Sequence, residues 1–131
     1  MKELKEYISE QLLLEMAQVG EINKSLTIYV RSNDPGNVPH FHVVDKSTLG
    51  NHFHTCVQIE SNKYFHHTGK EGILNSKERK LLVKFLSLMN DEFDNLTNYQ
   101  VIVRLWNMNN SIKKIKSSIE MPNYSTIKDN K

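Results

Sequence analysis

At 131 residues the chain is long enough for one domain with its own hydrophobic core, and its formal net charge is +2 at neutral pH. One cysteine excludes an internal disulfide, and a charge this close to balance excludes bulk attraction of the protein body to nucleic acid. No long apolar run follows a basic start at the N-terminus, so we expect a cytoplasmic protein without a membrane-spanning segment.

The first 31 residues predict a helix followed by a strand. Apolar side chains from Leu4 to Met16 recur at a spacing that approximates one face of an amphipathic helix over residues 3–18, and Gly20 suits the end of such a helix. Residues 25–31, SLTIYVR, alternate apolar and polar side chains. That pattern is typical of a half-buried strand.

The segment SNDPGNVP, which follows this strand, contains two prolines and a glycine, so the chain must turn there. Such a loop can form part of a binding pocket or can only reverse the chain, and both readings stay open. If the loop binds a partner, the candidate contacts are Pro35, Asn37, Pro39, His40 and His42.

The tripeptide His-Phe-His occurs twice, at 40–42 and at 52–54, on either side of the polar segment DKSTLGN. Alternate side chains of a strand share a face, so each copy places two imidazoles on one face and a phenylalanine on the other. A hairpin that pairs His42 with His52 and His40 with His54 would bring all four imidazoles to one face. A slip of one residue would separate them.

The second copy continues as a strand over 53–60, and a tight turn leads into a further short strand over 63–67. The register expected for that turn places Cys56 opposite His67, on the face of the other histidines. One face of the sheet would then carry five of the six histidines and the single cysteine.

Two helices are expected in the second half of the chain. Asn75 is a candidate N-cap with Glu78 three residues later, and apolar residues then repeat at helical spacing over 76–90. A second helix is predicted over 98–109, although a run of Val and Ile within it favours a strand, because Thr97 begins a capping-box pattern.

These elements predict an α+β fold, with a small antiparallel sheet of three to four strands packed on helices, an N-terminal helix and a basic C-terminal tail. We expect one domain over 1–115 and a flexible tail over 116–131, the one part of the chain basic enough to contact nucleic acid. The expected core consists of Phe41, Val57, Ile59, Leu82, Phe85, Leu86, Leu105 and Trp106.

The doubled tripeptide is also a candidate metal site, because His-x-His on a strand directs two imidazoles towards one ion. Zinc, iron and nickel are the metals that such ligands suit. The candidate ligands are His40, His42, His52 and His54, with His67, Cys56 and Glu60 in reserve. The alternative is that these histidines are half-exposed sheet residues, which bind water or backbone or line a groove for a partner.

Three segments resemble an uncharacterised family of small bacterial proteins that carries a Pro-His-Phe-His-Val signature. They are IYVRSNDPGNVPHFHVV, KYFHHTGKEGILNSKERKLLVKFL and LTNYQVIVRLWNMNN, and the resemblance covers roughly residues 25–110. Its most specific part is Pro39 to Val43. The chain departs from the family pattern in its N-terminal helix, in the inserted DKSTLGNHFH and in its basic tail.

Members of such families are often encoded in toxin–antitoxin-like or mobile loci. The resemblance therefore implies a small bacterial or phage interaction module that binds a macromolecular partner, a protein first of all, in a defence, counter-defence or toxin–antitoxin setting. It carries over no catalytic residues, and the chain lacks a glycine-rich phosphate loop and a His-Glu-x-x-His helix. The competing hypothesis is a metal-dependent enzyme, a hydrolase or a non-haem metal enzyme, that uses the doubled tripeptide.

Overall fold

The structure is a computed structural model that describes residues 16–22, 26–31, 38–45, 53–65, 72–93, 95–109 and 114–128. Its strands and helices are β1 Met16–Glu21, β2 Leu26–Arg31, β3 His40–Asp45, β4 Phe53–Gln58, α2 Ser76–Ser87 and α3 Asn98–Asn109. The four strands form one antiparallel sheet in the order β1-β2-β3-β4. This confirms an α+β fold with a small antiparallel sheet.

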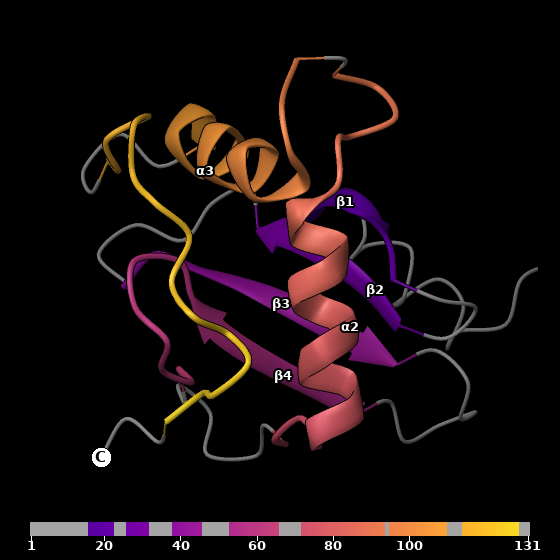
Figure 1. The fold of residues 1–131 in the computed structure, drawn as a ribbon. Coiled ribbons are helices and arrows are strands. Elements are labelled where there is room, and N and C mark those ends of the chain that lie inside the picture. The colour runs from indigo at the N-terminus through magenta and orange to yellow at the C-terminus, as the bar shows by residue number, and fades with distance from the viewer. Residues whose placement is uncertain are drawn as a thin grey trace, which may run out of the picture.

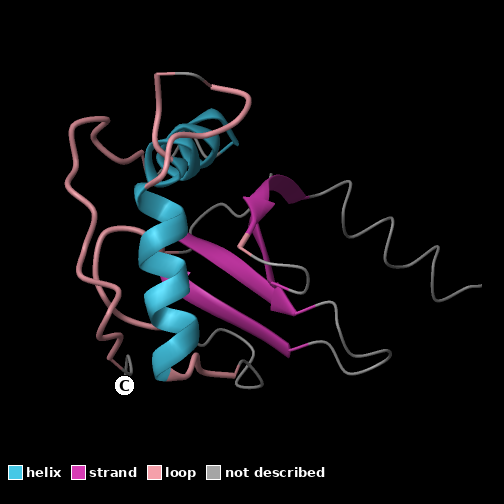
Figure 2. Cartoon of the chain, turned by 45° about the vertical axis from the view of Figure 1, so that its right-hand side comes forward, coloured by secondary structure: helices cyan, strands magenta, loops and turns pink. Residues whose placement is uncertain are grey.

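The two helices pack against different parts of the sheet (Figures 1 and 2). Helix α2 crosses one face of the sheet, and α3 contacts β1, β2 and the neighbouring helix. Neither helix has the length and the apolar run that crossing a bilayer requires, and the same holds for the rest of the described chain.

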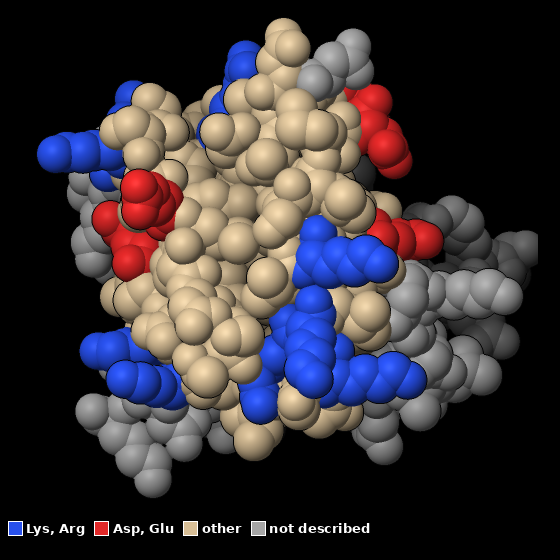
Figure 3. Space-filling model, in the orientation of Figure 1, with Lys and Arg blue, Asp and Glu red and all other residues tan. Residues whose placement is uncertain are grey.

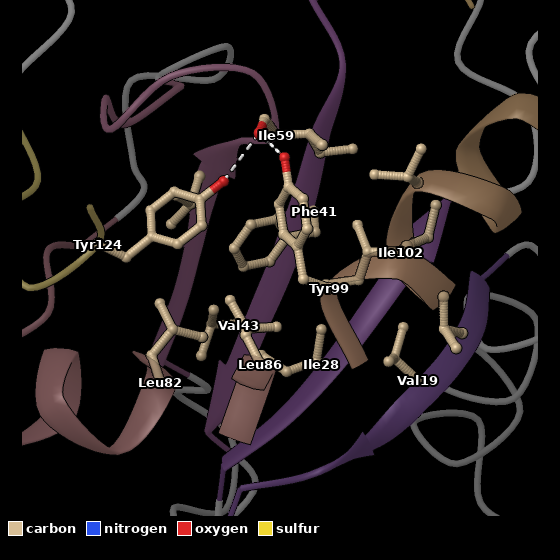
Figure 4. Close-up of a cluster of buried hydrophobic side chains, with 14 of the residues drawn as sticks. Val19, Ile28, Phe41, Val43, Ile59, Leu82, Leu86, Tyr99, Ile102 and Tyr124 are labelled. Carbon is tan, nitrogen blue, oxygen red and sulfur yellow. Dashed lines mark hydrogen bonds between the residues drawn. The ribbon is translucent and has the colours of Figure 1, made fainter. Parts of the chain in front are cut away.

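The core lies between α2 and the sheet face that carries the apolar residues of the strands (Figure 4). Ile28 of β2 pairs with Val43 of β3, and Phe41 pairs with Val57 of β4, so these side chains share one face. All four are buried, as is Leu82 of α2. Of the eight expected core residues, six are fully buried, while Phe85 and Leu105 pack against the core and stay partly exposed.

The second face of the sheet is buried as well, which the alternating pattern of the strands does not predict. In β2, Thr27 and Tyr29 are buried like the apolar residues that alternate with them, Leu26, Ile28 and Val30. In β3, His40 and His42 are buried on the same face as Tyr29, because Tyr29 pairs with His42. The histidines of β3 are therefore interior residues.

Both predicted helices are confirmed, with small changes of length. Helix α2 begins with a complete capping box, in which the Asn75 side chain accepts from the Glu78 amide and the Glu78 side chain accepts from the Asn75 amide, each at 2.8 Å. It ends at Ser87, three residues before the predicted end at 90. Helix α3 has the predicted bounds, and its Trp106 is fully buried, as that assignment requires.

The helix predicted over 3–18 is not confirmed. Residues 1–15 lie outside the described chain, and Met16 already belongs to β1. Gly20 is not a helix cap, because it lies within β1 beside an irregularity of the register. A Cβ atom built on Gly20 would lie 2.8 Å from Cζ of Phe85, so glycine lets β1 approach α2 closely.

The C-terminal segment packs against the domain, so the predicted flexible basic tail over 116–131 is not confirmed. Tyr124 is fully buried, and its hydroxyl donates to the carbonyl oxygens of Gln58 at 2.7 Å and Ile59 at 3.0 Å. Tyr99 donates to the same Ile59 carbonyl at 2.7 Å (Figure 4). Burial raises the pKa of both tyrosines far above the ordinary value, and the charge of Glu60 raises the pKa of Tyr99 further.

In the described part of the strand predicted over 63–67, which ends at residue 65, the pairing consists of two isolated bridges. Tyr64 pairs with Val57, and Lys63 pairs with Lys128 of the C-terminal segment in parallel. The Tyr64 amide donates to the Lys128 carbonyl, and the Lys128 amide donates to the Asn62 carbonyl, both at 2.9 Å. The end of the described chain therefore completes this edge of the domain.

Candidate metal centre

The register of β3 against β4 decides which side chains meet on the histidine-bearing face. His42 pairs with Cys56, and His40 pairs with Gln58. The sequence left the register open, and the pairing that would put His42 opposite His52 and His40 opposite His54 differs from the observed one by four residues along β4. Because the shift is an even number of residues, the faces are unchanged, and His40, His42 and Cys56 still share one face.

Three potential metal ligands come together at this point. The ligand atoms of His40, His42 and Cys56 all lie within 4.8 Å of one another, and the Cys56 sulfur lies 3.4 Å from Nδ1 of His42. Around a tetrahedral zinc ion, bond lengths of about 2.0–2.1 Å to nitrogen and 2.3 Å to sulfur put these two ligand atoms roughly 3.6 Å apart. The pair is thus already near the spacing that a shared ion requires.

The ring of His40 is oriented by a hydrogen bond outside this group of three. Its Nδ1 lies 2.7 Å from the carbonyl oxygen of Val38. A carbonyl oxygen only accepts, so Nδ1 carries the proton and Nε2 is the nitrogen with the lone pair. Metal-binding histidines characteristically donate their second nitrogen to a carbonyl or carboxylate in this way, which sets the tautomer and the ring direction.

Aromatic rings surround the His40 imidazole. The centroid of its ring lies 5.0 Å from that of His42, 4.6 Å from that of Phe65 and 5.7 Å from that of Trp106. The exposed fraction is 0% for His40 and Cys56 and 1% for His42. An apolar shell of this kind lowers the local dielectric and strengthens the attraction between a cation and a thiolate.

The chemistry of the three ligands restricts the metal. A thiolate is a soft ligand and imidazole is borderline, so the set favours zinc or copper(I) and disfavours magnesium and calcium, which take oxygen ligands. Three protein ligands leave one position of a tetrahedral ion for a further group. Iron and nickel, predicted as alternatives, are compatible with imidazole but gain less from the sulfur.

Of the other predicted ligands, only Glu60 has a side chain that the structure describes, and it is not part of this group. His52 and His67 lie outside the described residues. His54 pairs with Val44 in the backbone register, two residues beyond the position of Cys56. Glu60 is exposed beyond the end of β4.

The structure describes three of the five predicted partner contacts, and all three are buried. Pro35 and Asn37 lie outside the described residues, whereas Pro39, His40 and His42 are buried. A partner cannot reach these three side chains without opening the domain, so their burial favours a structural or metal-binding role.

Cys56 is the member of this group that the sequence analysis named only as a reserve ligand. The expected register, which places Cys56 opposite His67, is wrong. The Phe65 amide donates to the Cys56 carbonyl at 2.9 Å, so Phe65 lies opposite Cys56. The sequence pointed to Cys56 only through the alternation of side chains along a strand. Cys56 is an even number of residues from His52 and His54, so in one continuous strand it would share their face.

Comparisons with known proteins give no relative for this chain. No family model, no curated protein and no solved structure matches it. The resemblance to a small bacterial family therefore stays a prediction, and function has to be argued from the site itself.

Proposed function

We propose that this protein binds one transition metal ion, zinc first of all, through His40, His42 and Cys56. The observation that carries the proposal is the convergence of three buried ligand atoms within 4.8 Å of one another. The hydrogen bond from His40 to the Val38 carbonyl supports it, because it directs the remaining nitrogen of that ring as a ligand.

The ion in this proposal stabilises the fold and does not take part in catalysis. A catalytic metal needs an open position that substrate can reach. The three protein ligands leave a fourth position on the ion, but the ligands themselves are buried and His40 is surrounded by aromatic side chains, which argues against access of a substrate. The ion would join β3 to β4, and binding would contribute directly to the free energy of folding. Burial is thus a further reason to prefer this role over that of a metal-dependent enzyme.

The function of the domain as a whole is then that of a metal-stabilised interaction module. Binding of a macromolecular partner in a defence, counter-defence or toxin–antitoxin setting remains the prediction made from the sequence. The alternative for the three side chains is a buried Cys–His hydrogen bond that only satisfies polar atoms, and this alternative requires no metal.

Metal analysis of protein purified without a histidine tag tests the proposal. We expect about one equivalent of zinc per chain, and cobalt substitution should give visible ligand-field bands with a thiolate charge-transfer band. At a free zinc concentration of 100 times Kd the ion adds about 2.7 kcal/mol to stability, so a chelator should lower Tm. Cobalt should also quench Trp106, the single tryptophan, because its ring lies 5.7 Å from that of His40.

Conservative variants separate the proposed ligands from the other histidines. Cys56→Ser and His42→Gln should abolish the cobalt bands and the response of Tm to chelator, whereas His52→Gln and His54→Gln should keep both. Loss in the last two variants with retention in Cys56→Ser would move the ion to the ligands predicted from the sequence. Less than a tenth of an equivalent of any metal, with no cobalt bands in the folded wild-type protein, would leave only the buried hydrogen bond.

A further inference from the structure

A groove of about 770 Å³ is lined by the second half of β1, the last turns of α2 and the loop that follows α2. Neither His40, His42 nor Cys56 lines it, so it is independent of the proposed metal site. Its volume falls in the range of clefts that bind ligands and peptide side chains.

The loop wall of the groove is held rigidly by two buried asparagines. The Asn90 amide nitrogen donates to the Val19 carbonyl at 3.3 Å and to the Asn98 side-chain oxygen at 2.8 Å. The Asn98 amide nitrogen in turn donates to the Phe85 carbonyl at 2.7 Å. The loop is thereby tied to β1, α2 and α3, and the groove is already formed before anything binds.

The same contacts argue against a partner that extends the sheet. The Val19 carbonyl of the edge strand β1 already accepts from Asn90, and the register of β1 is irregular between Gln18 and Gly20. Bulges and side chains that occupy edge groups are the usual protection of an edge strand. An occupant would therefore be recognised through its side chains.

Apolar side chains in the lining of the groove are exposed. Leu88 and Met89 each have an exposed fraction of 53%, and the partly buried Ile22 and Phe85 also line the groove. Adjacent exposed apolar residues of this kind mark interaction surfaces, and methionine adapts its shape to different partners.

The charges around the groove are predominantly negative. Glu21, Asp91 and Glu92 are exposed in its lining, against the single base Lys84. Figure 3 shows acidic side chains on the side where β1 and the loop after α2 lie, while basic side chains gather lower, over α2. The chain as a whole carries a net charge of +2, so this acidity is local.

We infer that the groove binds a cationic amphipathic segment of a partner protein. Apolar side chains of the segment would contact Leu88 and Met89, and its Lys or Arg side chains would face Glu21, Asp91 and Glu92. Charge complementarity selects this occupant, because opposed potentials guide association and reject acidic competitors. The preformed walls lower the entropic cost of binding.

Selection from a displayed library of random peptides, with the full-length protein as target, tests the inference. Enriched peptides should combine Lys or Arg with aliphatic or aromatic residues. A fluorescein-labelled consensus peptide should bind more weakly at high salt. Removing the three charges together, with Glu21→Gln, Asp91→Asn and Glu92→Gln, should weaken binding about tenfold, since each rim charge contributes modestly.

A matched pair of apolar variants completes the test. Leu88→Ser should reduce peptide affinity at least tenfold, whereas Ile73→Ser, at a comparably exposed position before α2, should leave it unchanged. A selection without a basic consensus, or binding that is indifferent to the charge variants and to Leu88→Ser, would overturn the inference. Self-association in sedimentation that Leu88→Ser abolishes would assign the groove to a second copy of the chain and would likewise overturn it.

Discussion

Replacing Tyr124 with phenylalanine should destabilise the domain at neutral pH and flatten its loss of stability in alkali. The ring of Tyr124 is fully buried, and it lies edge-on to Phe41 with centroids 5.7 Å apart. Its hydroxyl donates to the carbonyl oxygens of Gln58 and Ile59, at the end of β4 and just after it. Phenylalanine keeps the packing and removes only this donor.

The neutral-pH cost follows from the hydrogen bonds that are lost. The Ile59 carbonyl keeps its bond from Tyr99 at 2.7 Å, so the Gln58 carbonyl is the group that loses its hydroxyl partner. Leaving one buried acceptor in this state should cost about 1–2 kcal/mol.

The alkaline effect follows from the raised pKa values of Tyr99 and Tyr124. Above the ordinary tyrosine pKa of about 10 the unfolded chain releases both protons while the folded chain retains them. This contribution to stability is therefore intact below about pH 10 and is lost as the pH rises. Each tyrosine adds a slope of about 1.4 kcal/mol per pH unit, or roughly 2.7 for the two.

Urea unfolding of the wild type and both Tyr→Phe variants, at pH values from neutral to about 12, measures both effects. Tyr124→Phe should halve the tyrosine contribution to the alkaline slope, and Tyr99→Phe should do the same. If Tyr124→Phe unfolds at the wild-type urea concentration at neutral pH and keeps the full alkaline slope, the C-terminal segment does not bury its tyrosine, and the reasoning fails.

Two further stability predictions concern local contacts. Asn75→Ala removes the N-cap of α2 and should cost about 1 kcal/mol, measured by urea unfolding; an unchanged midpoint would mean that the capping box of Asn75 and Glu78 is not stabilising. Gly20→Ala should cost about 1–3 kcal/mol because the new Cβ lies 2.8 Å from the Phe85 ring. In a double-mutant cycle Phe85→Leu should relieve that penalty, and strictly additive effects would show that the two residues do not meet.

Local sequence patterns determine a large part of this fold. The existence of strand β2, the capping box at Asn75 and the helical spacing that buries Trp106 depend on residues close in sequence, and all appear as predicted, although β2 is buried on both faces and not on one. The face of each histidine in β3 is equally determined, because side-chain direction along a strand has a period of two. These features need no contribution from distant parts of the chain.

The N-terminal strand and the position of the C-terminal segment depend on contacts far apart in sequence. Helical spacing around Met16 is a reasonable local interpretation, but pairing with β2 places these residues in the sheet and Val19 in the core, and local spacing does not encode that pairing. The segment around Tyr124 has no periodicity, and its tyrosine is held by the carbonyls of Gln58 and Ile59.

The candidate metal centre depends both on local sequence patterns and on contacts between segments far apart in the sequence. Alternation along β3 puts His40 and His42 on one face of that strand, but whether Cys56 of β4 shares this face depends on the register between the two strands, and local sequence does not fix that register. Burial of that face beside Trp106 and pairing across the full sheet decide that His42 meets Cys56 instead of His52. The sequence by itself therefore determined which side chains of one strand face the same way, and the tertiary structure alone decided which side chains of different strands come within reach of one ion.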